Sequence, residues 1–137
     1  GFKKSNRKED EFEIATLKVC AVNKNRSSAR ALAKHSIAFY STLPYFDAVL
    51  DPAGFTKEKD KIRSMFSKNN IEGMLSAVSE DMVDKLALSG THDDVISQAK
   101  CFEGLIDTLI LYCPTFGVTA EQSRENHEAM IDAFRDW

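Results

Sequence analysis

The sequence predicts an α/β fold built around parallel β-strands. Three short runs are almost entirely apolar, at residues 14–22, 86–89 and 108–112, which is typical of strands buried on both faces. The last third of the chain follows the order strand, helix, strand, helix, and a helical crossover joins parallel strands. We therefore expect residues 86–89 and 108–112 to lie side by side and to run in the same direction.

The chain begins with a charged segment and continues as one domain. Residues 1–13 carry four basic side chains followed by four acidic ones, and charge runs of this kind are usually solvated. A chain of 137 residues with 43% hydrophobic side chains has enough apolar surface for a core. We therefore expect a solvated lead-in over residues 1–13 and a folded domain over residues 14–137.

The first strand leads into a helix with a narrow face of small side chains. Residues 14–22 are rich in β-branched side chains, and Asn23-Lys24-Asn25 ends the run. Beyond Ser27 the pattern changes to helical spacing, which suits close packing on a sheet. The residues on this expected face are Ala29, Leu32, Ala33, Ser36, Ile37 and Tyr40.

The middle of the chain, residues 41–79, is expected to be a helical excursion without strands. Pro44 and the Asp51-Pro52-Ala53-Gly54 turn interrupt it. Thr56 is expected to be the N-cap of a short charged helix, and a second short helix is expected over about residues 72–78.

Local capping signals define the helices of the last third. Thr91 is followed three residues later by Asp94, and Thr119 by Gln122, which are both capping-box patterns. Ser79 is expected to cap a short helix ahead of the second strand. The final helix is expected to place four side chains along one side: His127, Met130, Ile131 and Phe134.

The composition excludes several classes of function. The net charge of −3 lacks the basic surplus of a nucleic-acid-binding protein, and no apolar run approaches the roughly 18 residues of a membrane helix. The cysteines are odd in number and widely spaced, so we expect neither a disulfide framework nor a metal site; they are Cys20, Cys101 and Cys113. These features predict a cytoplasmic protein with reduced thiols and without nucleic-acid or membrane partners.

Two segments that follow strands carry candidate binding residues. Asn23 comes directly after the first strand, and active sites of parallel barrels lie at the carboxyl ends of strands; the alternative is a solvated loop. Gly90 and Thr91 join a strand to a helix N-terminus, whose N–H groups can hold an anion. The alternative is a capped turn that serves only its own helix, and Asp93 and Asp94 would repel an anion there.

Three parallel strands are too few for a complete sheet. Each edge strand leaves unpaired backbone groups, and a complete (β/α)8 barrel needs about 250 residues. We therefore expect a missing N-terminal half or a second subunit to supply the partner strands, and a homo-oligomer is the expected state.

One stretch carries a motif known from a protein family. Residues 82–87 read hydrophobic-Val-Asp-x-hydrophobic-Ala, and residues 90–95 read Gly-Thr-His-Asp-Asp-Val. With residues 12–40 and the excursion around Tyr45-Phe46 and Gly54-Phe55, they make residues 10–134 resemble the C-terminal portion of the bacterial-luciferase-like superfamily. That group contains flavin-dependent monooxygenases and coenzyme F420-dependent oxidoreductases of the methylenetetrahydromethanopterin reductase kind. Ser79 and His92 depart from the pattern, because proline is frequent at both positions.

The resemblance implies a fold and a function. The fold would be a partial (β/α)8 TIM barrel, namely its C-terminal half, with about three parallel strands and the helical excursion. The activity would be hydride transfer between a flavin or deazaflavin and a small organic substrate. The cofactor would be coenzyme F420, with FMN as the alternative, or none bound by this chain alone; Asn23, Gly90 and Thr91 would contact it. The alternative function is a non-catalytic half-barrel that acts as an oligomerising or interaction subunit.

Overall fold

The computed structural model describes residues 12–137, so most of the expected charged lead-in, residues 1–11, lies outside the described part. Strands and helices alternate along the chain as an α/β protein requires. The elements are β1 (Ala15–Val22), α2 (Arg26–Ser41), the 3-10 helix η2 (Pro44–Phe46), α3 (Asp47–Leu50), α4 (Thr56–Phe66), α5 (Ile71–Ala77), α6 (Glu80–Leu86), β2 (Ala87–Gly90), α7 (His92–Lys100), β3 (Thr108–Tyr112) and α8 (Ala120–Ala133).

The three strands form one parallel sheet in the order β2-β1-β3. The first half of β1, Ala15–Val19, pairs with β3, and its second half, Val19–Val22, pairs with β2. The expected strands are therefore confirmed within one residue at their ends, as is their parallel direction. The expectation that residues 86–89 and 108–112 pair with each other is wrong, because β1 lies between them.

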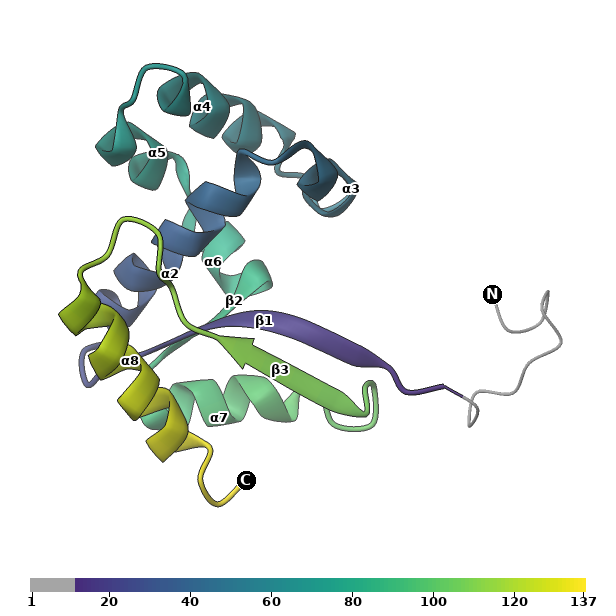
Figure 1. The fold of residues 1–137 in the computed structure, drawn as a ribbon. Helices are drawn as coiled ribbons and strands as arrows, with labels where there is room; N and C mark the ends of the chain where they lie inside the picture. Colours follow the sequence, from purple (N-terminus) through teal and green to yellow (C-terminus); the bar gives the residue numbers. More distant parts are fainter. Residues whose placement is uncertain (1–11) are drawn as a thin grey trace, which may run out of the picture.

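Helices pack on both faces of β2 and of the second half of β1, which explains this order (Figure 1). The expectation that all three strands are buried on both faces is wrong for the first half of β1 and for β3, where Leu17 and Ile110 are exposed. Val19 and Ala21 of β1 pack in a cluster with α2 and the excursion, whereas Cys20 and Val22 pack with α7 and α8. Three strands cannot close into a ring, so apolar strands need a helical layer on each side to bury both faces. The β1–β2 connection runs over one layer and the β2–β3 connection over the other, and this puts β2 and β3 on opposite sides of β1.

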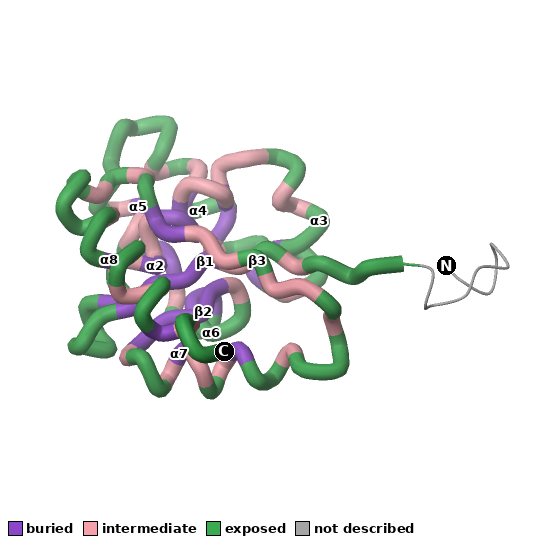
Figure 2. The backbone as a smooth tube through the Cα atoms, turned by 60° about the horizontal axis from the view of Figure 1, so that its bottom comes forward, coloured by how far each residue is buried: buried purple, intermediate pink, exposed green. Residues whose placement is uncertain are grey.

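The buried residues concentrate where β1 and β2 meet helix α2 (Figure 2). Ala29, Ala33 and Ala38 of α2 are fully buried, so the helix lies close to the sheet, as its spacing of small side chains predicts. All four residues of β2 are buried.

Residues 41–79 consist of helices and turns, as expected, and a buried lysine ties them together. Lys59 is 5% exposed and its Nζ lies 2.6 Å from Asp51 Oδ1 and 3.4 Å from Asp47 Oδ1. One detail of the prediction is wrong: Thr56 is the first residue of α4 and Phe55 is its N-cap. Because Thr56 already lies inside the helix, its hydroxyl does not cap it and instead donates to the Asp51 carboxylate of the preceding turn at 2.8 Å.

Both predicted capping boxes form, at Thr91–Asp94 and Thr119–Gln122, and the side chain of Ser79 caps α6. The expected inner face of α8 is wrong in part. His127 and Ile131 are exposed, Ile131 by 60%, and the buried residues of α8 are Asn126 and Ala133. The helix therefore turns Asn126 toward the sheet, because the Asn126 side chain hydrogen-bonds the backbone at the end of β1.

Candidate functional site

The carboxyl ends of β1 and β2 meet at one edge of the sheet. The backbone N–H of Asn23 donates to the carbonyl of Gly90 at 3.0 Å, so the two segments predicted to bind a ligand are neighbours. The end of β1 also lies between α2 on one face and α8 on the other. In open α/β sheets, ligands bind in the crevice outside the carboxyl ends of strands, where the strand order reverses. β1 is the strand at which the order reverses here.

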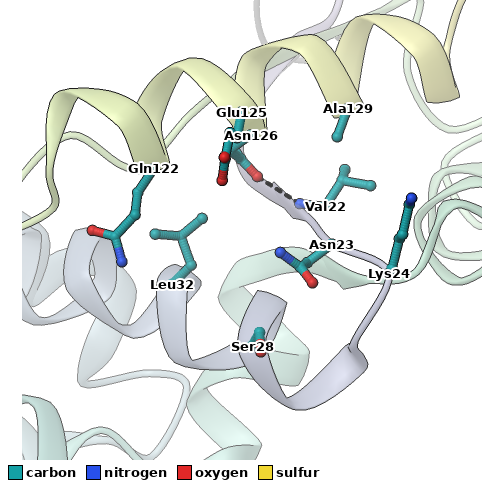
Figure 3. A pocket seen from close by; sticks show the side chains of 9 residues that line it. All are labelled: Val22, Asn23, Lys24, Ser28, Leu32, Gln122, Glu125, Asn126 and Ala129. Carbon is teal, nitrogen blue, oxygen red and sulfur yellow. Dashed lines mark hydrogen bonds between the residues drawn. The ribbon is translucent and has the colours of Figure 1, made fainter.

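A cleft opens at this point between α2 and α8 (Figure 3). Its volume is about 410 Å³, within the range of small-molecule sites. A second hollow of about 600 Å³ continues it along α8 and shares Lys24, Glu125 and Ala129 with it. The residues that line the cleft are Val22, Asn23, Lys24, Ser28, Leu32, Gln122, Glu125, Asn126 and Ala129.

Asn126 builds the inner wall of the cleft. It is 2% exposed, its Oδ1 accepts from the Val22 N–H at 2.7 Å, and its Nδ2 donates to the Cys20 carbonyl at 3.0 Å. These two backbone groups lie on the edge of β1 that pairs with β3, but past Val19, where the pairing with β3 ends. The amide of Asn126 thus replaces one residue of a parallel strand, and this pins α8 to β1.

Asn23 and Lys24 form the opposite wall. The Oδ1 of Asn23 accepts from the Asn25 N–H at 2.9 Å, which holds the side chain and leaves its amide nitrogen on the side of the cleft (Figure 3). Lys24 lines both hollows and stands across from Glu125. The cleft therefore offers amide donors and acceptors, one cation and one carboxylate around the apolar side chains of Val22, Leu32 and Ala129.

The Gly90–Thr91 turn lies beside the cleft but does not line it. The backbone N–H of Thr91 donates to Asp94 Oδ2 at 2.9 Å, and Arg26 Nε donates to the same oxygen at 2.9 Å. The Arg26 guanidinium, together with the Thr91 N–H, lowers the pKa of the Asp94 carboxyl to about 2. The Asp94 carboxylate already occupies the N-terminus of α7, so an incoming anion would have to displace it.

The thiols near the site are buried and protonated. Burial, reinforced by the neighbouring Cys113, raises the pKa of the Cys20 thiol to about 12, and burial also raises the pKa of the Cys113 thiol. All three cysteines are free. Within residues 12–137, no group of three or more His, Cys, Asp or Glu side chains is arranged to hold a metal ion.

The structure thus places Asn23 in the cleft and Gly90 and Thr91 at its side, and it adds a wall that the sequence reasoning missed. Gln122, Glu125 and Asn126 all come from α8. A signal for Asn126 was present, because it precedes Ala129 and Ala133 at helical spacing and so lies on the face of small side chains. A polar residue on such a face is usually hydrogen-bonded and buried.

Comparison with known proteins identifies related sequences. The sequence profile of the family described as "Luciferase-like monooxygenase" matches residues 1–108. A 5,10-methylenetetrahydromethanopterin reductase of Archaeoglobus fulgidus is 28% identical over 105 residues, which cover 72% of this chain and 31% of that enzyme.

A solved structure shares the fold. The coenzyme F420-dependent tetrahydromethanopterin reductase of Methanopyrus kandleri superposes with a TM-score of 0.66 at 22% identity, covering 82% of this chain and 34% of that one. This likeness confirms the expected fold class, an α/β arrangement that is part of a (β/α)8 barrel. The chain spans about a third of the length of both relatives. Between Phe12 and Trp137, none of the helices is both long and apolar enough to span a bilayer.

Proposed function

Because the chain belongs to the luciferase-like monooxygenase family, we propose that it forms the C-terminal part of an oxidoreductase that uses coenzyme F420. Both relatives are reductases, and the Methanopyrus kandleri enzyme depends on coenzyme F420. The activity would be hydride transfer between the deazaflavin and a small organic substrate. Since this chain spans about a third of the relatives' length, the rest of the substrate site would come from other strands.

The observation that carries this proposal is the cleft at the carboxyl end of β1. In a (β/α)8 barrel the active site lies at that end of the strands, and Asn23, predicted as a cofactor contact, lines the cleft here. The donor set fits a planar ligand with a polar edge, because amide groups surround three apolar side chains. The bound deazaflavin would supply the centre that accepts and releases hydride.

The residues at the cleft would then have distinct roles. The amide nitrogen of Asn23 would donate to a carbonyl at the edge of the ring, and Lys24, which also lines the cleft, would attract an anionic group of the cofactor. Gly90 accepts the Asn23 N–H at 3.0 Å and so holds that loop in place, while Thr91 sets the position of α7. FMN is the alternative cofactor, since the same contacts suit its ring.

Titration of the purified chain with coenzyme F420, followed by absorbance, tests the proposal. We expect saturable binding that weakens about tenfold in Asn23→Leu, equivalent to about 1.4 kcal/mol. Lys24→Met is expected to weaken binding as well, whereas Lys57→Met, which removes an exposed lysine of α4, serves as the control. A parallel titration with FMN decides between the cofactors. If neither cofactor binds saturably, the chain has no cofactor site of its own.

A second candidate is supported by a separate observation. Helices cover both faces of β2 and of the second half of β1, and side-chain amides satisfy the backbone at the ends of these two strands: Asn126 on β1 and Gln98 on β2. A unit of this kind is complete enough to act as a non-catalytic interaction subunit. Absence of cofactor binding together with a stable complex with a barrel polypeptide would favour this second candidate.

A further inference from the structure

Strand β1 is divided between two partners. Its residues Val19–Val22 pair with β2, and its residues Ala15–Val19 pair with β3. In a closed (β/α)8 barrel each strand pairs with the strands before and after it in the sequence. The pairing of β1 with β2 obeys that order, but the pairing with β3 does not.

The edge that β3 covers therefore belongs to another strand in a closed barrel. The chain spans about a third of its relatives' length, so those proteins contain further segments that could supply a strand ahead of β1. Such a strand would need the backbone groups of Ala15–Val19 that β3 now occupies.

Packing of β3 against β1 is weak on one face. Leu17 and Ile110 are register partners, yet they remain 60% and 47% exposed. Helix α8, which follows β3, packs on β1 and α7. Its Asn126 side chain hydrogen-bonds the backbone of β1 beyond the point where β3 ends. On the opposite face, Leu109 and Leu111 of β3 pack in the cluster with α7 and α8. The poorly packed part of the β1–β3 contact is therefore the face that carries Leu17 and Ile110.

In a barrel, β3 would pair with the outer edge of β2, and here a side chain occupies that edge. On β2, the Ser89 N–H donates to Gln98 Oε1 at 2.9 Å, and Gln98 Nε2 donates to the Ser89 carbonyl at 3.1 Å. These backbone groups point away from β1, since Leu88 and Gly90 alternate with Ser89 along the strand. Gln98 thus blocks the edge of β2 that the next strand of a barrel would use.

We propose that β3 is a self-docked strand that covers the edge of β1 at Ala15–Val19, the edge that receives a parallel strand from the rest of a luciferase-like barrel. When that strand docks, β3 leaves β1 and takes the outer edge of β2 in place of the Gln98 amide. Because the docking strand belongs to the remainder of such a barrel, this role rests on the function proposed above.

A disulfide across the two strands tests the proposal. Leu17→Cys with Ile110→Cys joins register partners on adjacent strands, which lie about 4.8 Å apart and within reach of a disulfide. The exposed Cys101 is replaced by serine in all variants, and the Leu17→Cys single variant is the control. The binding probe is the Archaeoglobus fulgidus reductase without the segment aligned with this chain, which is 31% of its length, made as a separate polypeptide.

We expect the disulfide to form on mild oxidation and the reduced variant to bind the probe at least tenfold more tightly than the oxidised one. Failure of the disulfide to form in the folded chain would overturn the inference and leave the proposed function intact. Equal binding of the probe by both forms would also overturn the inference about β3, but it would support the proposal that this chain forms part of a larger barrel. If neither form binds a probe that still binds the removed segment of its own enzyme, the inference and the proposed function both fail.

Discussion

The side-chain oxygen of Asn126 lies 2.7 Å from the backbone nitrogen of Val22, 104 positions away in the sequence. With its amide nitrogen 3.0 Å from the Cys20 carbonyl, Asn126 bonds the residues on either side of Ala21, as one residue of a parallel strand would. This contact joins the last helix to the central strand and closes the inner end of the cleft.

Asn126→Leu should destabilise the chain by about 2–4 kcal/mol, because the Val22 N–H and the Cys20 carbonyl would be left buried without partners. Chemical denaturation followed by circular dichroism measures this change. Glu128→Gln, on the exposed side of the same helix, is the control and should be nearly neutral. Equal stability of Asn126→Leu and wild type would show that water or another group replaces the amide.

Gln98→Leu should open the outer edge of β2. The N–H and carbonyl of Ser89 lose their partner, so the free energy of unfolding should fall by about 1–2 kcal/mol. An unpaired strand edge also favours pairing with a second chain. Light scattering after size-exclusion chromatography should therefore show self-association that increases with concentration. Ser97→Leu adds the same apolar side chain at an exposed position of α7 and should leave the mass unchanged.

Gly90→Ala should cost about 1–3 kcal/mol through backbone strain and a clash. Gly90 has a φ of +149°, and an added Cβ would lie 2.5 Å from Asp94 Oδ2. Gly54→Ala is the matched control, because Gly54 has a φ of +88° but no atom within 4 Å of the added Cβ. A larger loss of stability in Gly90→Ala would assign the difference to the Asp94 contact, and equal losses would argue against it.

Acid should remove the contribution of Asp94 to stability. The Arg26 guanidinium lowers the pKa of this carboxyl from 3.8 to about 2 in the folded chain, so the stabilisation is complete above about pH 4 and is lost as the pH falls through about 2. Asp94→Asn should therefore unfold at a lower temperature than wild type at pH 7, and the gap should narrow toward pH 2.

Thermal unfolding at a series of pH values measures that gap. Asp93→Asn is the control, because the Asp93 side chain is almost fully exposed and does not contact Arg26 in any ion pair of the described chain. A gap between Asp94→Asn and wild type that stays constant from pH 7 to pH 2 would contradict the assigned role.

Features that depend on neighbouring residues could be predicted from the sequence. The capping boxes at Thr91 and Thr119 form as expected, since each needs only residues three positions apart. The positions of the strands follow from short apolar runs, although only β2 and the second half of β1 are buried as those runs predict. The place of Asn23 follows from the end of its strand. Thr56 shows the limit of local reasoning, because its hydroxyl bonds Asp51 of the preceding turn instead of capping its helix.

The sequence by itself determined where strands and helices lie, because side-chain periodicity and capping act over a few residues. Only the tertiary structure decided the order β2-β1-β3, since pairing depends on which faces the helices can bury together. It also decided that Asn126 and Gln98 complete the sheet, because a side-chain amide finds such partners only after distant segments have packed.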